Sequence, residues 1–351
     1  MCTRIFLGLC GGKEPFRFLG FSVFFDLIEI FCTHTHTHTH IIRVKMHPHH
    51  LGIVLGLIAC VLNATGMNFQ KIGQQNGRGY VTIFGLILSA IAGISDVSSF
   101  SFAPQSLLAP LGAITLVCNL LVAPLIDAKE KLTKIDILAT TIISAGVVGC
   151  VSASLGDNEN SSTAPFRNLK DLEETITRPV AIQFICAVQA LLAILFISMF
   201  RLEKTLDSSS SPGLRGAIYP IISGLLACLT VTSAKFAGEV TKLNDESSTW
   251  LLVCGWGMVA GGAVMNTYMM NRGFSKGISS LFAVPVMSGC AVVFNTLSGA
   301  FFFGESSTFT AYQWKAIPIS VGIVLLGISV LLSKSADDSS MESDAKKKKD
   351  Q

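Results

Sequence analysis

Long apolar runs separated by short charged links constrain this chain more than any other feature of its sequence. A helix of about 20 apolar residues crosses the hydrocarbon core of a bilayer, which is roughly 30 Å thick. Only helices and closed barrels satisfy all of their backbone hydrogen bonds in lipid. Barrel strands alternate apolar and polar residues, whereas these runs are continuously apolar. The sequence therefore predicts an all-α integral membrane protein.

The composition agrees with this fold class. Of the 351 residues, 50% are apolar and only 14% are charged, whereas soluble domains carry about 25% charged residues. An ordinary soluble domain is therefore excluded. We expect nine spans, at residues 51–71, 80–102, 104–126, 136–154, 179–200, 216–239, 250–270, 279–303 and 314–333.

The first 45 residues do not fit this pattern. Residues 33–40 read THTHTHTH, which is what a CA dinucleotide repeat in untranslated sequence gives when it is read as codons. We therefore expect residues 1–45 to be a non-native or disordered leader, and the working protein to begin at Met46. The alternative is a histidine-rich arm that binds metal.

The remaining chain repeats itself. A pentapeptide, a proline, a glutamate and a glycine recur in the same order, at offsets between 168 and 176 residues. They are GLIAC (56–60) and GLLAC (224–228), Pro110 and Pro285, Glu130 and Glu305, Gly146 and Gly322. Each partner lies five spans away, and because five is odd, the two halves run in opposite directions. The sequence thus predicts an inverted repeat, as in many secondary transporters.

The charged links predict the domain organisation and the orientation. From Met46 onward, fifteen Lys and Arg residues lie on one side of the expected bundle and five on the other. Basic loops mark the cytosolic side, so we expect the N-terminus outside or lumenal and the C-terminus cytosolic. Asn160 is a glycosylation candidate in the outer loop. The expected parts are the leader (1–45), a first repeat of four spans (46–154), a lumenal or extracellular loop (155–178), a second repeat of five spans (179–334) and a disordered basic tail (335–351).

Four stretches resemble the NIPA family of magnesium transporters. They are FAPQSLLAPLG (102–112), KEKLT (129–133), LTVTSAKF (229–236) and NTYMMNRGF (266–274). The resemblance implies a bundle of the drug/metabolite transporter superfamily that carries Mg²⁺ or other divalent cations, with no cofactor. The chain departs from the family pattern at two places. Many members carry Glu-x-x-Asn where this chain has Gly93 and Asp96, and Asn266 stands where the family has a glutamine.

Ionisable residues inside spans are costly, and they are therefore candidates for function. Asp96 is the candidate metal ligand, and Asn266 occupies the corresponding place in the second repeat, 170 residues later. Amide oxygens suit Mg²⁺, and prolines free backbone carbonyls. The transport-path candidates are Asp96, Asn266, Lys235, Asn63, Asn119, Pro110 and Pro285. The alternatives are interhelical hydrogen bonds for the amides, static kinks for the prolines and a structural ion pair of Lys235 with Asp96 or Glu239.

Other functions and other cellular locations stay open at this point. A metabolite or nucleotide-sugar carrier of the same superfamily is the alternative, although only Lys235 supplies a basic group within the spans. A membrane enzyme is not expected, because the sequence has no HExxH, P-loop or nucleophile elbow. The basic run Lys346–Lys349 indicates contact with anionic lipid rather than with nucleic acid. The family resemblance implies the plasma membrane or early endosomes, whereas Lys348 and Lys349 resemble a dilysine signal for the endoplasmic reticulum.

Overall fold

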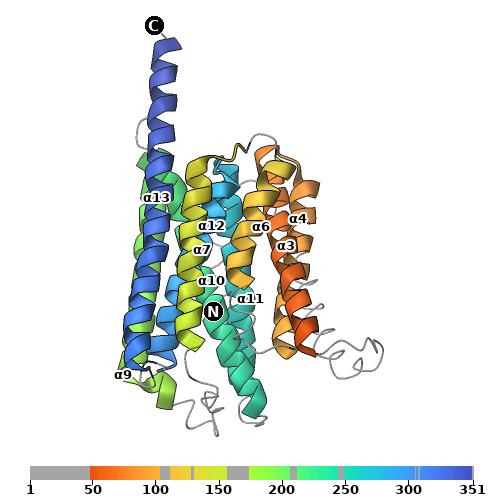
Figure 1. Cartoon of the computed structure of the whole chain (residues 1–351), viewed down its shortest axis with the longest axis vertical. Coiled ribbons are helices and arrows are strands. Elements are labelled where there is room, and N and C mark those ends of the chain that lie inside the picture. Colours follow the sequence, from red (N-terminus) through yellow and green to blue (C-terminus); the bar gives the residue numbers. More distant parts are fainter. Residues whose placement is uncertain are drawn as a thin grey trace. The chain divides into compact units, whose positions relative to one another are not determined.

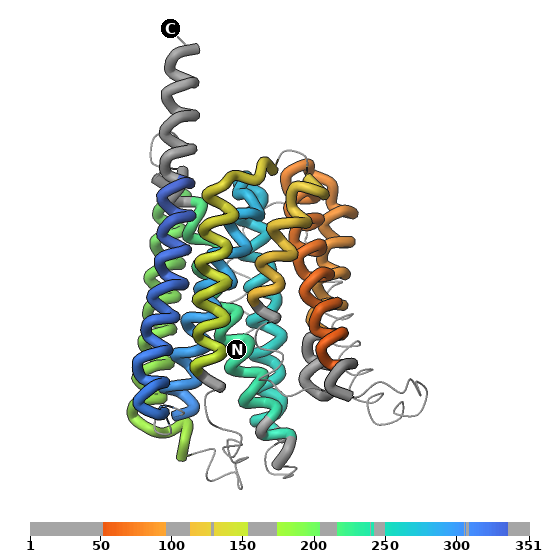
Figure 2. The backbone as a smooth tube through the Cα atoms, in the orientation of Figure 1, coloured from red at the N-terminus to blue at the C-terminus, as the bar shows by residue number. Residues whose placement is uncertain are grey.

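The computed structural model describes residues 48–102, 111–127, 130–155, 174–205, 212–243, 249–304, 306 and 309–349. Its elements are helices that pack side by side (Figures 1 and 2). They are α3 (Pro48–Gln75), α4 (Gly79–Phe102), α6 (Leu111–Ile126), α7 (Lys134–Leu155), α9 (Pro179–Thr205), α10 (Pro212–Leu243), α11 (Thr249–Ser275), α12 (Ser280–Leu297), the π-helix η2 (Ser298–Phe302) and α13 (Ala311–Lys349).

The predicted all-α membrane class is confirmed. The described residues contain no strand, and seven of the helices are long and apolar enough to cross a membrane. These seven coincide with seven of the nine expected spans. Shorter apolar helices at residues 79–95 and 113–126 overlap the other two, so the count of nine stays a prediction. Large apolar side chains such as Leu125, Ile194 and Val253 are exposed, as lipid-facing surfaces require.

The two halves of the bundle repeat the same packing. In the first half α3 packs on α4 and α6, and in the second half α10 packs on α11 and α12. The related helices also meet each other, because α6 contacts α12 and α7 packs along α13. α9 packs against α10 and has no counterpart among the described helices of the first half. The contact pattern is therefore that of a repeat with one additional helix.

Contacts at one end of the bundle show that related helices run in opposite directions. Gln75, at the end of α3, donates from Nε2 to the carbonyl of Ile278 at 3.5 Å, just before α12 begins. Ile278 packs against the apolar cluster that contains Tyr219, near the start of α10. Lys334 of α13 pairs with Asp136 in the first turn of α7. Thus α3 ends where α10 starts, α7 starts where the apolar part of α13 ends, and the repeat is inverted.

The contact between α7 and α13 corrects one detail of the predicted repeat. A Cβ atom at Gly146 would lie 2.6 Å from Cγ2 of Val324, and a Cβ atom at Gly327 would lie 2.6 Å from Cγ1 of Ile143. These two glycines are therefore equivalent, and each allows the helices to approach closely. Gly322, which the sequence matches to Gly146, is exposed, and its Cβ would meet no described atom within 4 Å.

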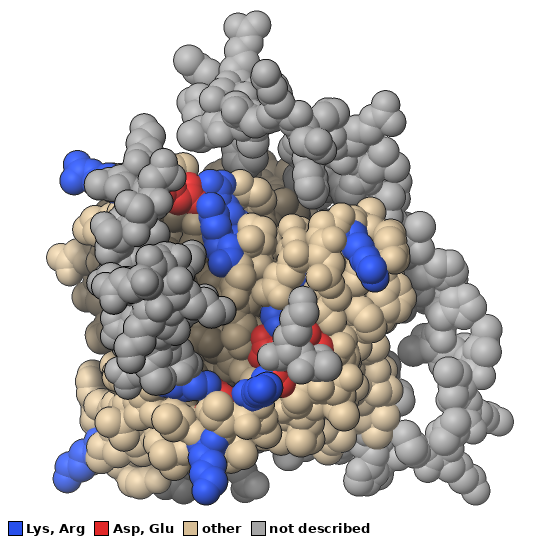
Figure 3. Space-filling model, turned by 90° about the horizontal axis from the view of Figure 1, so that it is seen from above, with Lys and Arg blue, Asp and Glu red and all other residues tan. Residues whose placement is uncertain are grey.

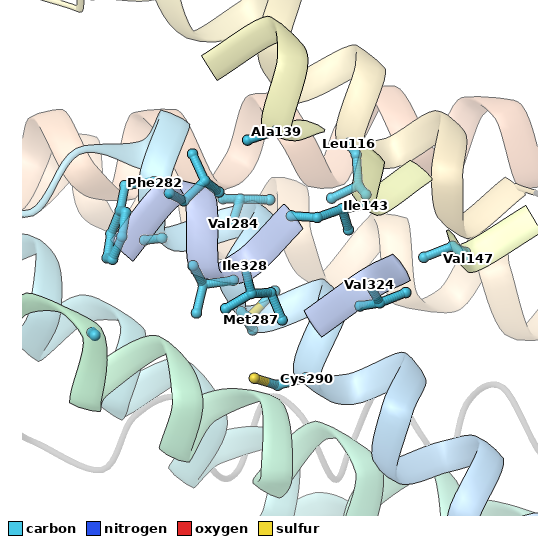
Figure 4. Close-up of a cluster of buried hydrophobic side chains, with 14 of the residues drawn as sticks. Leu116, Ala139, Ile143, Val147, Phe282, Val284, Met287, Cys290, Val324 and Ile328 are labelled. Carbon is cyan, nitrogen blue, oxygen red and sulfur yellow. The ribbon is translucent and has the colours of Figure 1, made fainter. Parts of the chain in front are cut away.

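The main apolar core lies between the two halves. Side chains from α6, α7, α12 and α13 meet there, among them Leu116, Ile143, Met287 and Val324 (Figure 4). A second cluster joins α9, α10 and α11. Buried polar residues that interrupt these apolar surfaces are therefore candidates for function.

The end of the chain differs from the sequence expectation. We expected a disordered tail from residue 335, but α13 continues to Lys349. Residues 335–349 contain no glycine and no proline, so nothing in this stretch interrupts a helix that has already been nucleated in the bundle.

Candidate functional site

At one end of the bundle, two carboxylates share a buried lysine. Lys71, in α3, is 3% exposed, and Asp127 and Glu130, in the link after α6, are each 8% exposed. Nζ of Lys71 lies 2.6 Å from Oδ2 of Asp127 and also donates to Oε1 of Glu130. Buried charges are stable only when they are paired, so these three side chains form one unit. We call this end of the bundle the charged end.

The Glu130 carboxylate also holds the start of α12, which belongs to the second half. Ser279 Oγ donates to Oε2 of Glu130 at 2.7 Å, and the backbone N–H groups of Ser280 and Leu281 donate to Oε1 and Oε2 at 3.0 and 3.4 Å. A helix start presents unpaired N–H groups and the positive end of the helix dipole. Both features stabilise the negative charge of Glu130.

A buried amide network lies next to this carboxylate. Asn68 of α3, Asn119 of α6 and Ser280 of α12 are all at most 1% exposed. Asn68 donates to Oδ1 of Asn119 at 2.9 Å, Asn119 donates to the carbonyl of Ser280 at 3.1 Å, and Ser280 Oγ donates to Oδ1 of Asn68 at 2.7 Å. The predicted candidate Asn119 therefore lies where three helices from both halves meet.

A cavity of about 320 Å³ lies beside this unit. In Figure 3, which views the charged end, acidic and basic side chains gather around a hollow. Asp136 is held there by Lys334, at 2.7 Å, and by Thr133. The charged residues of the lining are Lys71, Asp127, Glu130, Lys131, Asp136 and Lys334.

A second ion pair at the same end stays within the second half. Arg272 of α11 donates from Nε and Nη2 to the two carboxylate oxygens of Glu203 of α9, at 3.0 and 2.6 Å. Tyr219 of α10 donates to the same carboxylate at 2.6 Å. This bidentate arrangement fixes the three helices relative to each other. It does not join the two halves.

The predicted residues of the second half lie apart from the Lys71 unit. Asn266 of α11 accepts a hydrogen bond at Oδ1 from Ser223 of α10. Lys235 of α10 places its ammonium 4.2 Å from the centroid of the Phe303 ring, which is a cation–π contact. Pro285 is buried in α12, where it is the sixth residue of the helix.

Other predicted residues are only partly described. Asn63 lies on α3 and is half-buried. Asp96 falls within α4, but its side chain lies outside the described residues, as do Pro110 and Asn160. Within the described part of the chain, no group of three or more His, Cys, Asp or Glu residues is arranged to hold a metal. The assignment of Asp96 as a metal ligand stays a prediction.

A family model described as Magnesium transporter NIPA matches residues 49–297. The chain belongs to the NIPA family. Probable magnesium transporter NIPA8 of Arabidopsis thaliana is 23% identical to it over 312 residues, which cover 80% of this chain and 68% of that protein. Magnesium transporter NIPA1 of Mus musculus is 25% identical over 294 residues, which cover 78% of this chain and 85% of that protein. No solved structure matches the chain.

The match confirms the resemblance found in the sequence, and the region matched by the NIPA model includes the Lys71 unit. The sequence alone did not predict this unit. Lys71 follows an apolar run and therefore resembles a loop cation, and Glu130 stands out in the sequence only as a member of the repeat. A lysine and two acids at the same end of neighbouring spans were the available signal.

Proposed function

We propose that this protein moves Mg²⁺, and to a lesser extent other divalent cations, across a membrane. The observation that carries the proposal is the polar surface between the two inverted halves. The carboxylates of Asp127 and Glu130 line the cavity at the charged end, and buried oxygens of Asn68, Asn119 and Ser280 lie next to them. The NIPA relatives named as magnesium transporters support the choice of ion.

The chemistry of this surface suits a hydrated magnesium ion. Mg²⁺ binds oxygen atoms, usually keeps several of its waters and needs only one or two carboxylates. Six waters occupy about 180 Å³ at about 30 Å³ each, which the cavity of about 320 Å³ accommodates. A nucleotide sugar is less well matched, because its phosphates need an excess of basic groups, and the cavity pairs three lysines with three acids.

The path beyond the charged end is also part of the proposal. We assign Asp96 and Asn266 to it as the symmetry-related polar residues of α4 and α11, with Lys235 and Asn63 nearer the opposite end. The freed carbonyls at Pro110 and Pro285 supply further oxygens. We place the protein in the plasma membrane or early endosomes, with the charged end in the cytosol.

The test is a flux assay in proteoliposomes. The wild-type protein should load vesicles with Mg²⁺ faster than empty vesicles do, and it should not load a nucleotide sugar. Asp96→Asn should reduce the Mg²⁺ flux at least tenfold, because it removes the negative charge in α4. Glu203→Gln is the control, since Glu203 belongs to the ion pair within the second half. Equal fluxes in protein-containing and empty vesicles would refute the function.

A further inference from the structure

We propose that Glu130, Asn68 and Asn119 form a latch that holds the charged end closed, and that it must be released in each transport cycle. The latch consists of these three side chains of the first half and the segment Ser279–Leu281 of the second half. This inference rests on the proposed transport function, because it names the step that alternates access to the path.

Five hydrogen bonds make the latch, and each one crosses between the halves. Glu130 accepts three of them, from the hydroxyl of Ser279 and from the N–H groups of Ser280 and Leu281. Asn68 and Asn119 bind the hydroxyl and the carbonyl of Ser280. The start of α12 therefore fastens the two halves, beside the Asp136–Lys334 pair and the Gln75–Ile278 hydrogen bond, which also cross between them.

Lys71 and Asp127 are positioning residues for this latch. Both belong to the first half, and Lys71 donates to Glu130 and Asp127 together. When the second half moves away, Glu130 loses its three donors from α12 but keeps Lys71. A carboxylate left buried without partners is strongly destabilising, so Lys71 makes the released state attainable.

The second half contains an asparagine equivalent to Asn119 whose side-chain oxygen is not hydrogen-bonded among the described residues. Asn119 lies in V-C-N-L-L (117–121) of α6, and Asn295 lies in V-F-N-T-L (293–297) of α12, so the inverted repeat makes them equivalents. Asn119 is bonded at both its oxygen and its nitrogen. Oδ1 of Asn295 is buried and has no hydrogen-bond partner among the described residues.

This difference between the equivalent residues Asn119 and Asn295 indicates which conformation of the transport cycle the structure represents. A buried amide oxygen without a partner is unfavourable, so Asn295 gains by forming a contact like the one that Asn119 already has. In an inverted repeat, the two halves exchange conformations between states. The structure is latched at the charged end through Asn119, and the exchanged state is latched through Asn295.

The first test measures how accessible the region below the latch is. Ala64 lies one turn below Asn68 on α3 and is 0% exposed. A single cysteine is placed at Ala64 in a chain whose native cysteines are alanines, and its labelling by a membrane-impermeant maleimide is followed in sealed vesicles of both orientations. Glu130→Gln should raise the labelling rate from the charged end at least fivefold.

Two variants keep this test decisive. Glu203→Gln, which breaks the ion pair within the second half at the same end, should change the rate less than twofold. Ser279→Ala removes one donor of the latch, and it should raise the rate even if Glu130→Gln fails to fold. Equal rates in Ser279→Ala, Glu203→Gln and the parent protein would overturn the latch.

The second test fastens the latch. Cysteines at Gln75 and Ile278, whose side chain and carbonyl are hydrogen-bonded, are joined by a short reducible cross-linker. The cross-link should lower Mg²⁺ uptake at least tenfold, and reduction should restore it. Unchanged uptake through the cross-linked protein would contradict the latch. Absence of Mg²⁺ uptake before cross-linking, with the labelling result intact, would instead refute the proposed function alone.

Discussion

Lys71 is the residue on which the charged end depends. Its ammonium is the shared partner of Asp127 and Glu130, and all three residues are at most 8% exposed. We expect Lys71→Met to lower the free energy of unfolding by about 3 kcal/mol or more, because two buried carboxylates lose their partner. The midpoint of thermal unfolding in detergent is the measurement.

Lys131 provides the matched control for this prediction. It lines the same cavity but is exposed, so Lys131→Met should leave the midpoint nearly unchanged. The double variant Lys71→Met with Glu130→Gln should recover part of the loss, since one uncompensated charge is then removed. A midpoint for Lys71→Met equal to that of Lys131→Met would show that the buried pair contributes nothing.

At the scale of helices, the sequence predicts much of the fold, because a membrane span requires both length and continuous hydrophobicity. Which residues of two packed helices face each other is harder to predict, since apolar residues recur along a span with little variation. The sequence accordingly paired Gly146 with Gly322, whereas packing pairs Gly146 with Gly327. The Lys71 unit was missed for a different reason. A lysine at the end of a span looks the same in sequence whether it faces water or a carboxylate of another helix.

The contact between α7 and α13 makes a prediction at the same scale. A Cβ atom at Gly146 would lie 2.8 Å from the backbone nitrogen of Val324 and 2.9 Å from the carbonyl oxygen of Ser320. Neither atom can move without the helix, so we expect Gly146→Ala to destabilise the protein by about 1–3 kcal/mol. Gly322→Ala should have no such effect, because that position is open. Thermal unfolding of both variants decides, and equal midpoints would contradict the packing.

At the scale of the whole molecule, the ion pairs described above and two exposed tryptophans lie at different ends of the bundle. The Lys71 unit, the Glu203–Arg272 pair and Lys334 all lie at the charged end. At the start of α11 and of α13, which lie at the opposite end, Trp250 and Trp314 are 65% and 54% exposed. Exposed tryptophans are typical of the membrane–water interface, and basic residues mark the cytosolic side. From the basic residues we expect the charged end to face the cytosol, and this orientation stays a prediction.

This orientation predicts which residues each side of the membrane can reach. Lys131 at the charged end and Lys315 at the start of α13 are both exposed, and they lie at opposite ends. In chains with one cysteine at either position, an impermeant maleimide added to intact cells should label the Lys315→Cys protein at the cell surface. The Lys131→Cys protein should be labelled only after the membrane is permeabilised, because fifteen of the twenty loop and tail cations lie on its side. The reverse pattern would place the charged end outside and would mean that Mg²⁺ meets the latch from the extracellular side.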